Sequence, residues 1–339
     1  MAVQKVTSMD VARLAGVSQS AVSRVFTPGA SASAKTIAKV RKAADQLGYR
    51  PNVLARAVVS GKSRIIGLVV AYLNNQFYPE ALEKLTNTLQ ERGYHALVFM
   101  ASNSAQNIDK VVGEILDFQV DGIIAASVAL SSDLSARCQS AGVPMVLFNR
   151  GQDDPSMSSV TSDNLAGGRK VAEFLLAAGH KKISYIAGWE GASTQRDRET
   201  GFVAALNEAR VTLHSREIGN FGTEESKEAA RRMFASDPPD AVFVANDHMA
   251  IAVMDTLRFE LGFKIPEDVS VVGYDDVAVA AWPSYDLTTV RQPANRMVAE
   301  TVDILLSKID DPEMEPRQLE IDGPLIIRGS ARIPEGWKT

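Results

Sequence analysis

Three polar pairs and one aromatic pair follow apolar stretches of strand length. The polar pairs are Asn149-Arg150, Asn246-Asp247 and Asp275-Asp276, and the aromatic pair is Phe77-Tyr78. Because ligands bind at the carboxyl ends of parallel strands, these side chains are candidates for one binding site. Carboxylates, amides and an arginine beside a stacking aromatic ring suit a hydroxyl-rich ligand. They suit a metal ion or a general acid–base pair equally well, so residue types leave these chemistries open.

A second group of polar residues lies near the N-terminus, on the outer face of a short predicted helix. Gln19, Ser20 and Arg24 occupy that face, and the helix follows another one through a glycine-containing turn. Helix, turn and helix in this order are typical of a DNA-binding motif whose second helix enters the major groove. Glutamine can pair with adenine and arginine with guanine. Phosphate contacts are expected from Ser23, Lys35 and Thr36.

The charge distribution supports a polyanionic partner for the N-terminal segment alone. Residues 1–62 contain ten basic and two acidic residues, a net charge of +8. The rest of the chain has a net charge of −13, which gives the overall value of −5. A basic module on an acidic body is the pattern of a nucleic-acid-binding domain joined to a domain with another task.

Capping residues predict three short helices in this basic segment. Thr7 and Asp10 form a capping box before the first helix, and Ser18 and Ser33 are N-cap residues for the next two. Gly48 ends the third helix. The segment is therefore predicted to be an ordered all-α domain rather than a basic arm without structure.

From Arg64 onward, apolar strands alternate with amphipathic helices. The predicted strands are Ile65–Ala71, Ala96–Met100, Gly122–Ala126, Pro144–Phe148, Ile183–Ala187, Ala241–Ala245 and Ser270–Tyr274. Continuous apolar strands separated by helices indicate parallel sheets that are covered by helices on both faces. The number of units is too large for one compact sheet, so we expect two α/β lobes.

Several classes of protein do not fit the composition. Cys138 is the single cysteine, which excludes an internal disulfide and fits a reducing cytoplasm. No signal peptide or membrane-spanning stretch is expected. The four histidines have no metal-ligand spacing, and no nucleophile elbow is present. We therefore expect a cytoplasmic protein, and the family resemblance described next implies that it is not an enzyme and has no metal or other cofactor.

Several motifs along the chain belong together. They are the run from Val6 to Phe26, Gly48-Tyr49-Arg50-Pro51-Asn52, Gly179-His180-Lys181-Lys182-Ile183, the run from Pro266 to Asp276, and Leu287-Thr288-Thr289-Val290. In these motifs the chain resembles the LacI/GalR family of transcriptional regulators. The resemblance implies an N-terminal helix-turn-helix domain and a two-lobed α/β effector domain like the periplasmic binding proteins.

The resemblance implies a hinge helix that enters the minor groove when two subunits pair on DNA. Its expected contacts are Asn52, Ala55, Arg56 and Val58, and Thr7 and Ser18 complete the set in the helix-turn-helix domain. The family usually has leucine at the wedge position, where this chain has Val58. The shorter side chain predicts a weaker wedge or a shallower kink.

The resemblance also selects among the chemistries that the residue types leave open. It places a cleft for sugars, nucleobases or related metabolites between the two lobes. The implied contacts are Phe77 and Tyr78 on one lobe, and Asp163, Arg196, Arg198, Phe221, Asn246 and Asp275 on the other. Arg196 and Arg198 are both included because the family uses either spacing. Asp247 and Asp276 are expected to be structural.

The implied layout has three parts. The helix-turn-helix domain spans residues 1–50, a hinge helix and linker span 51–61, and the effector-binding and dimerisation domain spans 62–339. Lobe one is expected to take about 62–161 plus 290–323, and lobe two about 162–289 plus 324–339.

These features predict a homodimeric repressor of genes for the use of sugars or related metabolites. A small-molecule effector, with a sugar, sugar acid or sugar derivative favoured, would release it from double-stranded operator DNA. A regulator that needs its effector as co-repressor is the main alternative. A sugar receptor or a sugar-processing enzyme would share the two-lobed body but would leave Val6 to Asn52 unexplained.

Overall fold

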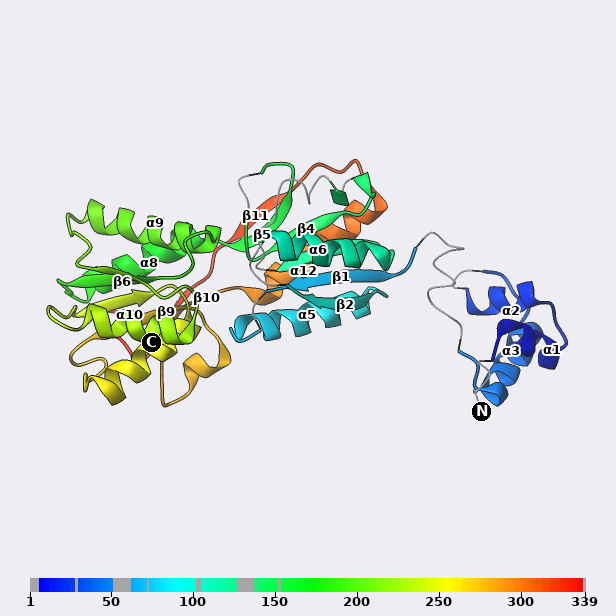
Figure 1. The fold of residues 1–339 in the computed structure, drawn as a ribbon, viewed down its shortest axis with the longest axis horizontal. Coiled ribbons are helices and arrows are strands. Elements are labelled where there is room, and N and C mark those ends of the chain that lie inside the picture. The colour runs from blue at the N-terminus through cyan, green and yellow to red at the C-terminus, as the bar shows by residue number, and fades with distance from the viewer. Residues whose placement is uncertain are drawn as a thin grey trace. The chain divides into compact units, whose positions relative to one another are not determined.

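The computed structural model describes residues 6–27, 30–50, 62–71, 73–101, 105–126, 137–138, 140–151 and 154–337. The chain divides into two compact units, Met1–Arg64 and Ile65–Thr339 (Figure 1). The expected hinge helix, with Asn52, Ala55, Arg56 and Val58, lies outside the described residues.

The N-terminal unit contains three helices, and local side chains set their ends. The helices are α1 (Ser8–Ala15), α2 (Gln19–Phe26) and α3 (Ala34–Leu47). Asp10 N donates to Thr7 Oγ1 at 3.4 Å and Thr7 N donates to Asp10 Oδ2 at 3.0 Å, which completes the capping box. Ser18 and Ser33 cap α2 and α3 in the same manner, each accepting a backbone N–H at 3.2 Å.

One buried side chain from each helix forms the centre of this small core. Val11, Val22 and Val40 are at most 1% exposed and belong to a single apolar cluster. Phe26 and Tyr49 close one side of it, with ring centroids 5.9 Å apart. The polar faces of the helices are therefore left at the surface of the unit.

Lobe one of the C-terminal unit is a six-stranded parallel sheet with helices on both faces. In spatial order its strands are β11 (Gln318–Ile321), β5 (Ser158–Ser162), β4 (Met145–Phe148), β3 (Gly122–Ala126), β1 (Ile65–Val70) and β2 (His95–Met100). Its helices are α5 (Phe77–Glu91), α6 (Ala105–Asp117) and α12 (Ala294–Asp310). Alternate residues of β1 pack to opposite sides, Leu68 in the core cluster of α5 and α12 and Val69 in that of α6.

Lobe two is a second six-stranded sheet, parallel except for one edge strand. In spatial order its strands are β12 (Leu325–Ile326), β10 (Thr288–Arg291), β9 (Ser270–Asp275), β8 (Ala241–Val244), β6 (Ile183–Ala187) and β7 (Arg216–Ile218), and β12 is antiparallel to β10. Its helices are α8 (Asn164–Ala177), α9 (Ser193–Glu208), α10 (Thr223–Met233) and α11 (Asp247–Asp255). A π-helical turn, Thr256–Glu260, extends α11, and a 3₁₀ turn spans Ala278–Ala281.

The chain passes between the two sheets at three places. It leaves lobe one after Ser162, returns after Arg291 and leaves again after Ile321 (Figure 1). The two lobes therefore share three short crossings rather than one linker. Two parallel sheets covered by helices, with an all-α N-terminal unit, confirm the predicted fold class.

Helices α8 and α9 of lobe two cross at very short range because glycines lie at the crossing. A Cβ on Gly168 would lie 2.0 Å from the carbonyl oxygen of Arg198, and one on Gly201 would lie 2.0 Å from that of Leu165. No side chain larger than hydrogen fits at either position without movement of the backbone. This contact holds the part of α9 that carries Arg198 against α8.

Candidate functional site

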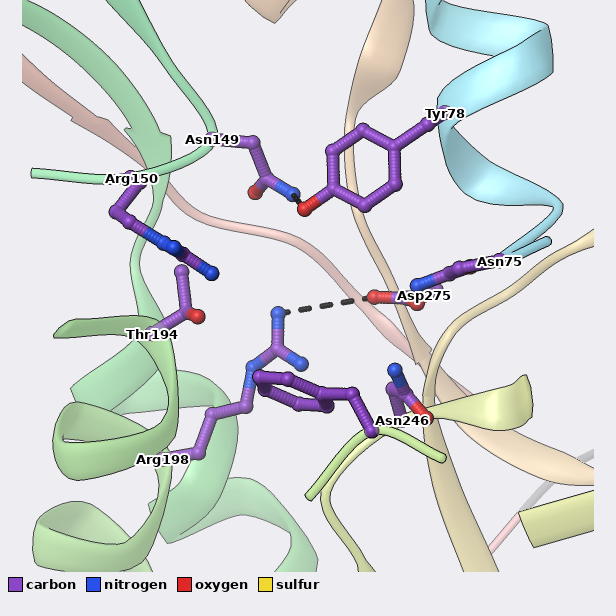
Figure 2. Close-up of a pocket in the computed structure, with 9 residues that line it drawn as sticks. Asn75, Tyr78, Asn149, Arg150, Thr194, Arg198, Asn246 and Asp275 are labelled. Carbon is purple, nitrogen blue, oxygen red and sulfur yellow. Dashed lines mark hydrogen bonds and ion pairs between the residues drawn. The ribbon is translucent and has the colours of Figure 1, made fainter. Parts of the chain in front are cut away.

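A cleft with side chains from both lobes lies at the carboxyl ends of the strands (Figure 2). Its lining encloses about 370 Å³, a volume that includes space open to solvent. Lobe one contributes Asn75, Tyr78, Asn149 and Arg150, and lobe two contributes Thr194, Arg198, Phe221, Asn246 and Asp275.

Arg198 is fixed at the base of the cleft by four contacts. Its Nε donates to Asn164 Oδ1 at 2.9 Å and its Nη1 donates to the Ala245 carbonyl oxygen at 2.6 Å. The guanidinium carbon lies 3.6 Å from the centre of the Tyr274 ring. Nη2 lies 3.6 Å from Asp275 Oδ1, an ion pair longer than a direct hydrogen bond. A buried cation held in this way can bind an acceptor group without losing further freedom.

Asp275 joins the two lobes. Its Oδ1 accepts from Gln292 Nε2 at 2.7 Å, and its Oδ2 lies 3.5 Å from Asn75 Nδ2 of lobe one. Burial raises the pKa of this carboxyl to about 6, although Arg198 and the two amides favour the charged form. Asp275 has a left-handed φ of 128° at the end of β9, a conformation that is uncommon for residues other than glycine.

The lobe-one wall is formed by residues after β1 and β4. Asn149 has a left-handed φ of 57°, and its Nδ2 donates to the Tyr78 hydroxyl at 3.1 Å. Arg150 is 3% exposed, and its guanidinium lies 5.5 Å from the centre of the Trp189 ring in lobe two. Figure 2 shows the Tyr78, Asn149 and Arg150 side chains directed toward the cleft.

Phe221 and Asn246 complete the lobe-two wall. Phe221 has a left-handed φ of 61°. A Cβ on Gly188 would lie 2.1 Å from the Phe221 ring, so the missing side chain of this glycine leaves room for the ring. Asn246 caps α11, because its Oδ1 accepts from Met249 N at 2.9 Å. The apolar ring and the amide therefore face the same space as the charged groups.

Five of the eight residues that the resemblance implies line the cleft, and three do not. Phe77 packs in the core of lobe one, stacked on Phe148 with centroids 6.3 Å apart. Asp163 caps α8 by accepting from Ala166 N at 2.9 Å. Arg196 is exposed at the surface of α9.

Four residues that line the cleft were absent from the implied set. Asn149 and Arg150 were already marked as polar residues after a strand, so their position was visible in the sequence. Asn75 accepts from Phe77 N at 3.1 Å at the start of α5, and Thr194 lies in the first turn of α9. Polar residues at the N-terminus of a helix that follows a strand were the signal for this second pair.

The two carboxylates that were expected to be structural have structural contacts. Asp247 accepts from Thr289 Oγ1 at 2.6 Å and from Val277 N at 3.0 Å, and burial raises the pKa of its side chain to about 7. Asp276 accepts from Arg291 at 2.5 Å and from Arg328 at 2.6 Å.

The polar face of α2, which the sequence predicts to meet DNA, lies at the surface of the N-terminal unit. Gln19, Ser20, Ser23 and Arg24 are exposed, as are Thr7, Ser18 and Lys35, and Thr36 is half-buried. Gln19 Nε2 donates to Ser8 Oγ at 3.0 Å and Ser20 bonds to Ser18 at 2.9 Å, so both would exchange partners to reach a base.

The described residues contain no helix that is both long and apolar enough to cross a membrane. Within the same ranges, no three His, Cys, Asp or Glu side chains are grouped so that they could hold a metal ion.

A helix-turn-helix unit on a two-lobed body with such a cleft defines a ligand-responsive DNA-binding regulator. Residues 7–52 match the bacterial regulatory proteins of the lacI family, and residues 172–331 match the periplasmic binding protein-like domain. The HTH-type transcriptional repressor PurR of Vibrio vulnificus (strain CMCP6) is 32% identical over 330 residues, which cover 96% of this chain and 98% of that protein. The chain belongs to the lacI family and is a DNA-binding transcriptional repressor with an effector-binding body.

Solved structures agree with this assignment over nearly the whole chain. The lac repressor dimer bound to operator and the anti-inducer ONPF has a TM-score of 0.87 and 27% identity, covering 96% of this chain and 99% of that one. The complex of the transcriptional regulator CelR with cellobiose has a TM-score of 0.73 and 31% identity, covering 96% of this chain and 100% of the other.

Proposed function

We propose that this repressor controls genes for the use of a sugar or related metabolite, and that binding of this metabolite in the cleft releases it from its operator. The observation that carries the proposal is that both lobes line one cleft. A ligand there contacts both lobes and therefore favours one arrangement of them over another. The effector changes DNA affinity only by that preference.

The proposed DNA contacts divide by role. Gln19, Ser20 and Arg24 on α2 read base edges, because they are exposed at the start and outer face of the helix. Thr7, Ser18, Ser23, Lys35 and Thr36 contact phosphates, and Asn52, Ala55, Arg56 and Val58 contact the minor groove. A homodimer places two such units on a pseudo-palindromic operator, as the lac repressor dimer bound to operator suggests by similarity.

The proposed effector contacts combine the implied set with the residues around it. Tyr78, Arg198, Phe221, Asn246 and Asp275 bind the ligand, together with Asn75, Asn149, Arg150 and Thr194. Phe77 supports Tyr78, and Asp163 supports α8, without lining the cleft. Arg196 reaches the ligand only if the lobes close further. The protein acts in the cytoplasm and catalyses no reaction, a view supported by the repressor names of its relatives.

The test begins with selection of an operator from random double-stranded DNA by the full-length protein. Affinity for that operator is then measured by fluorescence anisotropy with and without each of a set of sugars and sugar derivatives. Release on addition of one compound supports induction, and tighter binding would mean co-repression. Failure to select any sequence would refute the proposed function.

A further inference from the structure

The loop between β6 and α9 (residues 188–192) lies against groups that line the cleft on both lobes. A Cβ on Gly188 would lie 2.1 Å from the Phe221 ring, so the backbone of the loop lies directly against that ring. The Arg150 guanidinium of lobe one lies 5.5 Å from the centre of the Trp189 ring, which is within the range of a cation–π contact. The position of this loop therefore determines where the Phe221 and Trp189 rings can lie.

Gln195 fixes the start of this loop, although it is not among the residues that line the cleft. It is 1% exposed and lies in the first turn of α9. Its Oε1 accepts from Gly188 N and from the Tyr185 hydroxyl, each at 2.8 Å, and its Nε2 donates to Glu199 Oε2 at 2.8 Å. The amide oxygen thus holds the main chain where β6 ends, and both polar atoms of the side chain are bound.

A second connection from Glu199 reaches the middle of the loop. Arg216 of β7 donates from Nε to Glu199 Oε1 at 2.5 Å and from Nη2 to Glu190 Oε1 at 3.0 Å. Glu190 belongs to the loop, and Glu199 is the carboxylate that accepts from Gln195. Hydrogen bonds to charged groups are roughly twice as strong as those between neutral groups. Glu199 therefore fixes the orientation of the Gln195 amide and, through Arg216, the loop as well.

Loss of the Gln195 amide would release the loop. Gly188 is buried, and a buried main-chain N–H without an acceptor is costly, so the chain would move until this N–H met water or another acceptor. The Phe221 ring lies on Gly188, and Trp189 is the next residue of the chain. Such a movement would change the shape of the cleft without removing any side chain that lines it.

We propose that Gln195 is a positioning residue of the effector site, which holds the β6–α9 loop and thereby sets the places of the Phe221 and Trp189 rings. This inference rests on the proposed function, in which the cleft is the effector site. Gln195 does not touch the ligand, so its substitution acts on effector affinity through Phe221.

Trp189 reports on the loop without any ligand. The chain contains three tryptophans, so the full-length protein with Trp282→Phe and Trp337→Phe keeps Trp189 alone. Gln195→Met preserves the length of the side chain and removes its hydrogen bonds. Acrylamide quenching of Trp189 fluorescence should increase roughly twofold, because the half-buried ring becomes more accessible when the loop is released.

Exchange of the amide and the carboxylate tests the hydrogen bonds themselves. Gln195→Glu alone places two carboxylates side by side and should increase quenching as Gln195→Met does. Gln195→Glu together with Glu199→Gln restores an acceptor for Gly188 N and a donor between the two side chains, so quenching should return to the wild-type value. Gln90→Met on the exposed side of α5 is the matched control and should leave quenching unchanged.

Thermal midpoints identify a variant that fails to fold. If Gln195→Met does not fold, the comparison of Gln195→Glu with the exchanged pair decides. Unchanged quenching in folded Gln195→Met, or no recovery in the exchanged pair, would overturn the proposal.

A double-mutant cycle tests whether Gln195 acts through Phe221. Calorimetry with D-ribose, D-galactose and D-cellobiose selects as probe the sugar that the wild-type protein binds most tightly. If none of them binds, the probe is the compound that shifts operator affinity in the anisotropy measurement. Gln195→Met should weaken binding of the probe roughly tenfold, and by less than about twofold when Phe221→Ala is already present. Equal losses in the two backgrounds would overturn the proposal.

Operator binding by the same preparations separates this inference from the proposed function. If no operator is bound, the proposed function fails whatever the quenching of Trp189 shows. If a compound releases the protein from its operator and Gln195→Met responds at the same concentration as wild type, the positioning role fails and the proposed function stands.

Discussion

In the N-terminal unit, the contacts that define each helix join residues three or four positions apart, whereas the cleft joins residues separated by as many as 200 positions. The capping box of Thr7 and Asp10 involves only residues of one turn. Asn75 meets Asp275 only after both sheets have formed and the chain has crossed between them. The DNA-binding unit is therefore predictable from local rules, and the effector site depends on the whole body.

The largest expected effect comes from removing the carboxylate that joins the lobes. Asp275→Ala leaves Arg198 buried without its counter-charge and removes the acceptor of Gln292. Effector binding should weaken by roughly 2–5 kcal/mol while operator binding is kept. Asp303→Ala, at an exposed ion pair with Arg92, is the control. A normal effector dose-response in Asp275→Ala would place the effector elsewhere.

A substitution away from the ligand should show how far the cleft depends on packing. Gly168→Val introduces a side chain whose Cβ would lie 2.0 Å from the Arg198 carbonyl oxygen. We expect a loss of roughly 3 kcal/mol in the free energy of unfolding in urea, together with weaker effector binding. Gly151→Ala, with no atom within 4 Å of its added Cβ, should be nearly neutral. Equal stability of the two variants would show that the close crossing of α8 and α9 is unimportant.

The N-terminal unit should respond in the opposite sense, with DNA affinity lost and effector affinity kept. Arg24→Ala removes the guanidinium that we assign to a base edge and should weaken specific operator binding by roughly 1–3 kcal/mol. Arg13→Ala, on the exposed side of α1, is the control. If Arg24→Ala weakens binding to selected and random DNA equally, the residue contacts phosphate instead.

The pH dependence of stability should reveal the buried carboxylates of lobe two. Burial raises the pKa of Asp247 to about 7 in the folded protein, above its value of about 3.9 in the unfolded chain. Between these two pH values the folded state therefore binds more protons than the unfolded state. The contribution of Asp247 to stability is present at low pH and is lost as pH rises to about 7. Urea unfolding from pH 4 to pH 8 should show Asp247→Asn gaining stability relative to wild type as pH increases. A pH-independent difference would mean that Asp247 titrates normally.

The smallest effect is expected at a local cap. Thr7→Ala removes the side chain that accepts from Asp10 N and should destabilise α1 by about 1 kcal/mol. Amide hydrogen exchange in the full chain should then accelerate in α1, while exchange in the sheets stays unchanged. Thr7→Ser, which keeps the hydroxyl, is the control, and exchange in it should match that of wild type.

The sequence alone was sufficient for the parts that depend on neighbouring residues. Ser18, Ser33 and Gly48 mark helix ends because their caps involve only the adjacent turn. The strand pattern predicts covered parallel sheets because a strand buried on both faces must be apolar throughout. Family motifs then identify the class of protein, and the charge contrast shows which end meets DNA.

Neighbouring residues on a helix show where this reasoning stops. Arg196 and Arg198 are two positions apart, so they point about 200° apart around α9, and both fit the family's spacing. Only packing decides between them, since Arg198 is buried over Tyr274 and Arg196 is exposed. The same holds for Phe77, which turns into the core, and Tyr78, which faces the cleft.

The sequence by itself therefore determined the family, the order of the elements and the residue types available to each end of the strands. The tertiary structure decided which of those side chains meet, because three crossings bring the carboxyl ends of two sheets to one cleft. The sequence marks Asn75 and Thr194 only as polar residues at a helix start after a strand, and the crossings bring them to the same cleft. Their positions depend on contacts across the lobes, and no local pattern of residues encodes such contacts.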